Sequence, residues 1–136
     1  MVSQISQSVA LVTGLVLEVP MVPDMALGGN SRLHWTKRHR LFQAEKVACY
    51  ELVYIACNYD PGIPHFQHLN LGVEVVFQDK RNRDQDNVMH ALKALFDALV
   101  QLGVMPDDDT AHQTTTLTIT VDRERAPLTI LRMEEA

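Results

Sequence analysis

The amino-acid sequence predicts one α+β domain over residues 1–136, a mixed sheet packed by two helices in the order β-α-β-α-β-β. Short runs rich in β-branched residues alternate along the chain with segments whose apolar residues repeat at helical spacing. The composition is 46% hydrophobic and 21% charged, as in proteins that fold around one core. The sequence contains no repeat, linker or low-complexity tract, so we expect a single compact domain.

The first half of the chain predicts a strand, a helix and a second strand. Residues 9–19 (VALVTGLVLEV) are rich in β-branched residues and stop at a proline, which is typical of a strand. Two prolines and a Gly-Gly-Asn make residues 20–31 a loop. Residues 37–58 predict an amphipathic helix, and residues 69–77 (LNLGVEVVF) predict the second strand. The apolar face of that helix is expected to carry Leu41, Ala48, Leu52 and Ile55.

The clearest helix is predicted over residues 87–102. Its apolar residues recur at steps of four and three, which places them on one helix face. Asp86 or Asn87 is suited to cap the first turn, and Gly103 is suited to end the helix. The residues of that face are Val88, Leu92, Leu95, Leu99 and Leu102.

Two strands complete the predicted order, at residues 114–121 and 128–133. The connection between them, DRERAP, is short and polar, so it predicts a β-hairpin. Together with the earlier strands they form a sheet on which both helices pack.

Basic charge is concentrated although the chain is acidic overall, with a net charge of −5. This net charge argues against a protein that coats nucleic acid through bulk positive charge. Seven of the twelve Lys and Arg residues nevertheless fall within residues 32–40 and 80–83. A local contact with a polyanion is therefore still possible at these two stretches.

The cysteines and the N-terminal stretch indicate a reducing cytoplasm. Cys49 and Cys57 lie eight residues apart in a predicted helix, about 12 Å, which is beyond the reach of a disulfide. Free thiols suit the cytosol. The apolar run at residues 9–16 lacks the charged start of a signal peptide, and no segment has the length of a membrane span.

Acidic residues flank the helix predicted at residues 87–102. Asp84 and Asp86 precede it two residues apart, so in an extended backbone their carboxylates point the same way. The loop that follows holds Asp107, Asp108 and Asp109, about 24 Å away along a helix of this length. If the loop folds back, the carboxylates could share a Mg²⁺ ion. On spacing alone, a helix cap and a solvated acidic turn are the commoner outcome.

One helix face carries Asp86, His90, Lys93 and Asp97, at steps of four, three and four. Side chains lean toward the N-terminus of a helix, so Lys93 could reach back toward Asp84 and Asp86 and neutralise a developing negative charge. The simpler alternative is an exposed pair between Lys93 and Asp97.

The stretch NSRLHWTKRHR, residues 30–40, holds the only tryptophan of the chain among four bases and two histidines. Bases beside an aromatic ring suit phosphate contact together with stacking on a base or sugar. The alternative is a helix start whose tryptophan packs on the core and whose bases are solvated. The six histidines show no zinc-like spacing with cysteine, which argues against a structural zinc site.

Taken together, these features resemble the RusA family of endodeoxyribonucleases, which resolve Holliday junctions. The family motif runs R-D-x-D-N, then a helical lysine in roughly K-A-x-x-D-A-L, then a glycine and a D-D loop. The matching residues are Arg83, Asp84, Asp86 and Asn87, then KALFDAL at 93–99, then Gly103 and the acids at 107–109. The resemblance covers residues 80–109 and extends more loosely to NSRLHW at 30–35. Four elements in the same order favour a metal site over a cap and a turn.

The resemblance implies a mixed α/β fold and a Mg²⁺-dependent endonuclease, for which Mn²⁺ is a possible substitute. Asp84, Asp86 and Asp108 would bind the metal, with Asp107 beside the third ligand, although a register one residue later selects Asp109. Lys93 would be the catalytic cation. In the usual family form the lysine follows the asparagine by three residues, where this chain has His90, so His90 could take that role.

The resemblance also implies a cytoplasmic homodimer that cuts four-way or other branched DNA in recombination and repair. A two-fold assembly fits symmetric nicking of two strands. The basic side chains would bind phosphate, and Mg²⁺ bound to the neighbouring carboxylates would offset their repulsion of DNA. The residues expected to bind DNA are Lys80, Arg81, Arg83, Arg32, His34, Lys37, Arg38 and Arg40.

Two other functions share parts of this pattern. A non-catalytic module of the same fold would bind branched DNA without cutting it, because its lysine is displaced from the usual family position. A metal-dependent phosphohydrolase would act on small phosphate esters and would need a closed pocket. The two separate basic stretches favour a long, open phosphate track.

Overall fold

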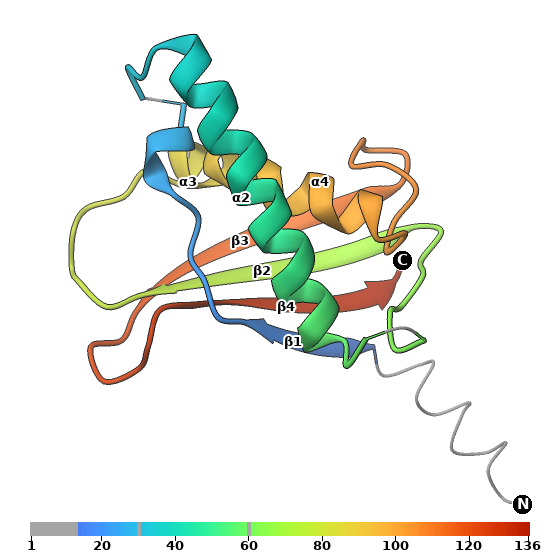
Figure 1. Cartoon of the computed structure of the whole chain (residues 1–136). Helices are drawn as coiled ribbons and strands as arrows, with labels where there is room; N and C mark the ends of the chain where they lie inside the picture. Colours follow the sequence, from blue (N-terminus) through green and yellow to red (C-terminus); the bar gives the residue numbers. More distant parts are fainter. Residues whose placement is uncertain (1–13, 30, 60) are drawn as a thin grey trace, which may run out of the picture.

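A computed structural model describes residues 14–29, 31–59 and 61–136 of the chain as a four-stranded sheet crossed by helices (Figure 1). The elements are β1 (Leu15–Val19), η1 (Met25–Leu27), α2 (Trp35–Ala56), β2 (Leu69–Phe77), α3 (Gln85–Ala91), α4 (Lys93–Gln101), β3 (Gln113–Val121) and β4 (Leu128–Glu135). This content confirms the predicted α+β class. Of the strand predicted at 9–19, residues 9–13 lie outside the described residues. None of the helices in the described part has the length and apolarity needed to cross a membrane.

The sheet is mixed, with the strand order β1-β4-β2-β3. β2 pairs with β3 in parallel, whereas β4 is antiparallel to both β1 and β2. The predicted hairpin between β3 and β4 is therefore wrong, because β2 lies between these strands. The burial of each strand explains this order: residues 128–131 are buried on both faces and suit a central strand, whereas the half-exposed threonines of β3 suit an edge.

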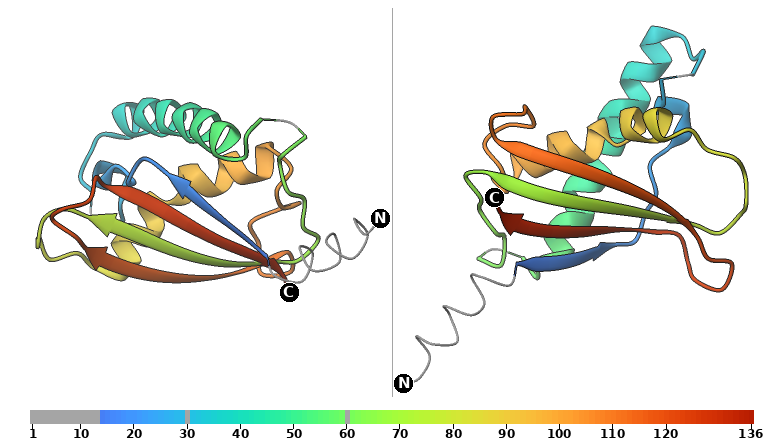
Figure 2. Two further views of the ribbon diagram at one scale, coloured as in Figure 1. Left: turned by 90° about the horizontal axis from the view of Figure 1, so that it is seen from below. Right: turned by 180° about the vertical axis from the view of Figure 1, so that it is seen from behind.

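The helices lie on one face of the sheet, and the main core forms beneath them (Figure 2). Alternate residues of β2, such as Leu71 and Val73, point into this core because side chains alternate between faces along a strand. The opposite face is largely polar. There Glu74 accepts hydrogen bonds from Thr120 Oγ1 (2.8 Å) and Arg132 (3.0 Å), and these hydrogen bonds lower the pKa of Glu74. A small second cluster on that face consists of Val76, Leu128 and Ile130.

α2 forms two residues earlier than predicted and buries a partly different face. Cys49 and Val53 are fully buried, and the predicted Leu52 packs against the core, whereas Ile55 is 54% exposed and Ala48 is exposed, so the predicted apolar face is only partly correct. Cysteine behaves as a small hydrophobic residue, which hydropathy spacing underestimates. Cys49 and Cys57 are free thiols, as predicted. Burial raises the pKa of Cys49 to about 12, which makes that thiol unreactive at neutral pH.

The second predicted helix is interrupted at one residue, Leu92, which separates α3 from α4. The N–H of Leu92 is shared between the carbonyls of Val88 (3.1 Å) and Met89 (3.2 Å), so the chain bends without losing its hydrogen bonds. All five predicted apolar residues are buried, which confirms that face. Further residues of α4 are buried as well, because this helix packs against both α2 and the core.

Gly103 ends α4 as the sequence predicts. Its φ of +83° lies in the left-handed region, its N–H reaches Val100 O (3.0 Å), and the N–H of Val104 reaches Leu99 O (2.9 Å). These two bonds form a Schellman motif, which satisfies the last carbonyls of the helix.

Replacing Gly103 tests this helix end. We expect Gly103→Ala to lower the free energy of unfolding by about 1–2 kcal/mol, because an L-residue is strained at positive φ. The matched control is Gly72→Ala, because an added Cβ there meets only ordinary contacts, the nearest at 3.7 Å from Arg132 Cβ. Urea unfolding followed by circular dichroism measures both variants, and equal stability of the two would contradict the assignment.

Candidate metal and nucleic-acid site

Asp84 and Asp86 lie at the start of α3, where the chain leaves β2. Asp84 is the N-cap, and its carboxylate accepts a hydrogen bond from the N–H of Asp86 (3.2 Å). The sequence predicted the cap at Asp86 or Asn87, which is two or three residues too late. The helix begins at Gln85, before Val88, the first residue of its apolar pattern. Both carboxylates are exposed at the N-terminal end of a helix, where the helix dipole favours negative charge.

Arg83 organises the loop between β2 and α3. Its guanidinium lies 3.6 Å from the centre of the Phe77 ring and forms a 2.8 Å ion pair with Asp79. The N–H of Arg81 and then the guanidinium of Arg83 hydrogen-bond Asp79, and these bonds lower the pKa of that carboxyl. Only 10% of the Arg83 side chain is exposed, so Arg83 has a structural role within the loop. Lys80 and Arg81 are exposed to solvent.

The loop after α4 returns to the start of that helix. Asp108 forms an ion pair with Lys93, and Lys93 also contacts Asp97 at 3.2 Å. The hydrogen bond between Lys93 and Asp108 raises the pKa of Lys93 and lowers the pKa of Asp108, although desolvation opposes both shifts. The expected pair between Lys93 and Asp97 is thus present, and the loop folds back far enough to add Asp108.

The three consecutive aspartates have different partners. Asp109 holds the turn, since its carboxylate accepts from the N–H groups of Ala111 and His112 at 3.1 Å each and contacts His112 Nδ1 at 2.7 Å. Asp107 accepts from the N–H of Asp108 (2.7 Å). Asp108 is the acid that the structure brings to α4.

The two groups of carboxylates lie along one helical segment. Asp86 precedes Lys93 by seven residues, about 10 Å of helix, and Lys93 holds Asp108. Within the described ranges, no group of three or more His, Cys, Asp or Glu residues is placed to hold a metal ion. The structure therefore brings Asp108 to Lys93 but does not bring Asp84, Asp86 and Asp108 together around one point.

The donors at the start of α3 still fit Mg²⁺ in their chemistry. Mg²⁺ prefers hard oxygen ligands and commonly uses one or two carboxylates, with water and substrate phosphate completing its octahedron. Asp84 and Asp86 supply two exposed carboxylates, separated by one residue. A two-carboxylate site of this kind needs no third protein ligand before a phosphate arrives.

A cleft of about 710 Å³ opens between α3, α4 and the start of β3. His90, Lys93 and Asp108 line it, and Met89 and Phe96 supply apolar surface. Met89 and Phe96 were not predicted as site residues, because apolar residues at helical spacing are typical of a buried core face. Gln113 was also missed; its side chain donates to the Asp108 carbonyl (2.8 Å) from the first position of β3.

The basic start of α2 is joined to α3 through η1. Arg38 donates to the carbonyls of Leu27 (2.8 Å) and Gly28 (3.2 Å), so its guanidinium is held by the protein. Gly28 and Gly29 have no Cβ, and this lets the loop lie directly against the side chains of Asn87 and His90. These contacts place α2, η1 and α3 at one end of the molecule (Figure 1).

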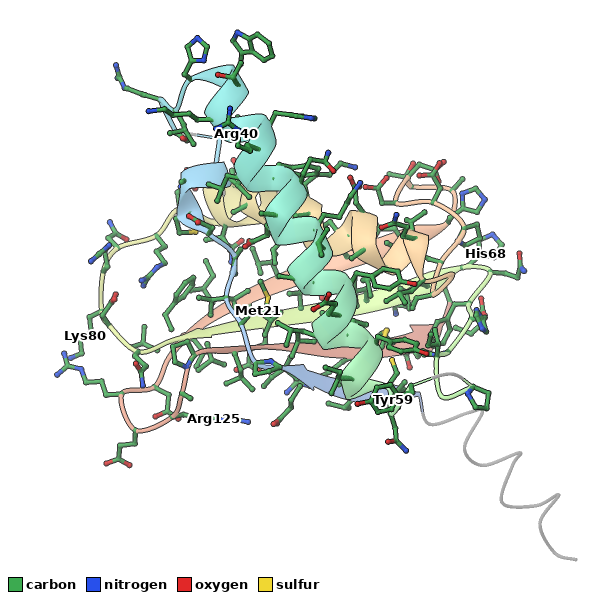
Figure 3. All side chains as sticks on the ribbon, in the orientation of Figure 1. Met21, Arg40, Tyr59, His68, Lys80 and Arg125 are labelled. Carbon is green, nitrogen blue, oxygen red and sulfur yellow. The ribbon has the colours of Figure 1, made fainter. Side chains whose placement is uncertain are left out.

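The remaining predicted DNA contacts at this end are accessible. Arg32, Lys37 and Arg40 are exposed, and His34 caps α2 by accepting from the N–H of Thr36 at 3.3 Å. Figure 3 shows Arg40 near the start of α2 and Lys80 on the separate loop after β2. Two exposed basic segments thus border the acidic start of α3.

A scan against models of known protein families finds none that matches the chain, and a comparison with curated proteins finds no match either. The likeness to the RusA family therefore rests on the motif residues alone.

The pair between Lys93 and Asp108 predicts a pH-dependent contribution to stability. It is present above the ordinary Asp pKa of 3.8 and below the ordinary Lys pKa of 10.5. It is lost as pH falls through the lowered pKa of Asp108, or rises through the raised pKa of Lys93. We expect Lys93→Met to cost less than about 1 kcal/mol at neutral pH, because the lysine is half exposed, and nothing at strongly acidic pH.

Urea unfolding across pH measures this loss, and carboxyl NMR should show the pKa of Asp108 rising toward its ordinary value in Lys93→Met. The control is Asp97→Asn, which leaves the partner of Asp108 in place. An Asp108 titration that Lys93→Met leaves unchanged would show that the ion pair does not form in solution.

Proposed function

We propose that this chain is a Mg²⁺-dependent, structure-specific endodeoxyribonuclease that cuts branched DNA, including four-way junctions. Mn²⁺ would be able to substitute for Mg²⁺ as the metal cofactor. The enzyme would act as a homodimer in the cytoplasm, since two symmetric nicks require two sites related by a two-fold axis. The proposal combines the RusA-like motif with the arrangement of charge around α3.

The arrangement of charge is the observation that carries the proposal. Exposed carboxylates at the start of α3 lie between two exposed basic segments, one on the loop after β2 and one at the start of α2. Basic side chains on both sides would contact the phosphates of one DNA strand. That strand would pass over the carboxylates that lie between the two segments. A solvated helix cap alone would not require this flanking charge.

Different residues would bind the metal and position the DNA strand. Asp84 and Asp86 would hold Mg²⁺. The motif implies Asp108 as a third ligand, but in this structure Asp108 is paired with Lys93, so it would join the metal only after leaving that pair. When bound, Mg²⁺ would polarise the phosphodiester and activate water. Lys80 and Arg81 would position the phosphate strand, while Arg83 keeps their loop in shape.

Lys93 would contribute a fixed positive charge. Its ammonium group is kept protonated by Asp108 and Asp97, which raise its pKa. A protonated lysine stabilises the negative charge that develops on phosphate oxygens in the transition state. His90 lines the same cleft and is the alternative cation.

The cleft favours a second candidate function. It holds Lys93 and Asp108 beside apolar surface, a lining that suits a small ligand, but it is an open cleft and not the closed pocket that a small-substrate phosphohydrolase would need. A small-substrate phosphohydrolase and a branched-DNA binder without activity are therefore the alternatives, and cleavage assays on both substrate types separate the three functions.

Removing the charge of the α3 carboxylates tests the metal assignment. Asn caps a helix as well as Asp does, so Asp84→Asn should preserve folding and junction binding. We expect Asp84→Asn and Asp86→Asn each to lower the rate of nicking of a synthetic four-way junction in Mg²⁺ by more than about a hundredfold, since even partners outside the metal shell can cost that much.

The matched control is Asp122→Asn, because Asp122 also accepts a hydrogen bond from the N–H two residues on, Glu124 at 3.0 Å. The Asp122→Asn variant should cut the four-way junction at the wild-type rate. Normal cleavage by the Asp84 or Asp86 variant would rule out the metal site.

The salt dependence of junction binding tests the phosphate contacts. Each lysine or arginine that contacts a phosphate adds about one to the slope of log affinity against log salt. We expect the double variant Lys80→Ala, Arg81→Ala to reduce this slope by about two. Arg38→Ala should leave the slope unchanged, because Arg38 is bound to backbone carbonyls. Equal reductions of the slope in both variants would contradict the assignment of Lys80 and Arg81 to phosphate contact and of Arg38 to a structural role.

A further inference from the structure

Trp35 is the most exposed large hydrophobic residue among those the structure describes, with 72% of its surface accessible. It is the first residue of α2, and its ring centre lies 5.9 Å from that of His34, tilted by 31°. Tryptophan is highly buried on average, and transferring its ring to water is unfavourable. An indole held in solvent at a helix start is therefore a candidate binding surface.

The charge around Trp35 indicates the chemistry of its partner. Arg32, Lys37 and Arg40 are exposed on the same short stretch, and no acidic residue occurs from position 32 to position 44. A basic surround is complementary to a polyanion and unfavourable for docking a basic or purely apolar protein face. Stacking on an aromatic ring, combined with phosphate contact, is how proteins hold unpaired nucleotides.

The first turn of α2, which carries Trp35, is held close to α3. Arg38, one turn along the helix, is bonded to the carbonyls of Leu27 and Gly28, and Gly28 lies against the side chain of Asn87. Asn87 follows directly after Asp86. A nucleotide on Trp35 would therefore bind at the same end of the molecule as the proposed Mg²⁺ site on the α3 carboxylates.

We propose that Trp35 is a stacking site for an unpaired base at the branch point of the DNA substrate. The inference rests on the proposed function, and it specifies what the enzyme recognises: an exposed base face beside a phosphate strand. In a continuous duplex both faces of each base are already stacked, so Trp35 would distinguish branched from linear DNA.

The single tryptophan makes the test direct, because all indole fluorescence comes from this position. Titrations are made in EDTA, which prevents metal-dependent cleavage, with three probes: oligothymidylate, a long blunt-ended duplex of two complementary strands and a four-way junction. We expect quenching by oligothymidylate and by the junction, and little quenching by the duplex. We expect Trp35→Ala to weaken binding of oligothymidylate and junction by roughly 5- to 150-fold. Trp35→Phe should restore part of the affinity.

Tyr59→Ala is the matched control. Tyr59 is a 52% exposed aromatic residue beyond the far end of α2, away from Arg40 (Figure 3). Its removal should leave affinity unchanged. Sedimentation of the wild type and of Trp35→Ala shows in addition whether the indole lies between two copies of the chain.

Equal quenching by the blunt duplex, or unchanged affinity of Trp35→Ala for the junction, would overturn the inference. Loss of a dimer in Trp35→Ala would also overturn it, because the indole would then be an interface residue. If quenching occurs but no DNA is cut in Mg²⁺, the inference stands and the proposed endonuclease function fails. If cutting occurs without any role for Trp35 in binding, only the inference fails.

Discussion

The parallel pairing of β2 with β3 is the constraint on which the rest of the structure depends. Parallel neighbours need a long crossover, and here α3 and α4 supply it. Because the crossover runs back along the sheet, α3 begins near the end of β2 and the chain re-enters at the start of β3. The acids before the crossover and the acids after it are thus separated by its geometry, and only the return of the loop brings Asp108 to Lys93.

Two arginines with structural contacts stabilise the segments that bring opposite charges to one end of the molecule. The loop after β2 is stabilised from within by Arg83, which leaves its other bases free to face outward. The start of α2 is held by Arg38 through the loop at Gly28. In each segment one arginine is used for structure and its neighbours are left exposed. The exposed basic side chains of these two segments are the ones that the proposed function assigns to phosphate contact.

The sequence predicted what depends on local chemistry. The strand at 69–77, the buried face from Val88 to Leu102 and the glycine that ends α4 all follow from alternation, helical spacing and the conformational freedom of Gly103. The predicted hairpin was wrong and the predicted buried face of α2 was only partly correct, because both depend on which elements become neighbours. The contact between Lys93 and Asp108 spans fifteen residues and requires a loop to return, which no local pattern specifies.

The central claim is that a divalent ion binds at Asp84 and Asp86. Its most direct test is titration of Mn²⁺ into the isotope-labelled protein, followed by the paramagnetic broadening of amide resonances. The account predicts that residues 84–87 broaden first, and that this broadening disappears in the variant with Asn at positions 84 and 86. Broadening centred elsewhere, or the same broadening in that variant, would contradict it.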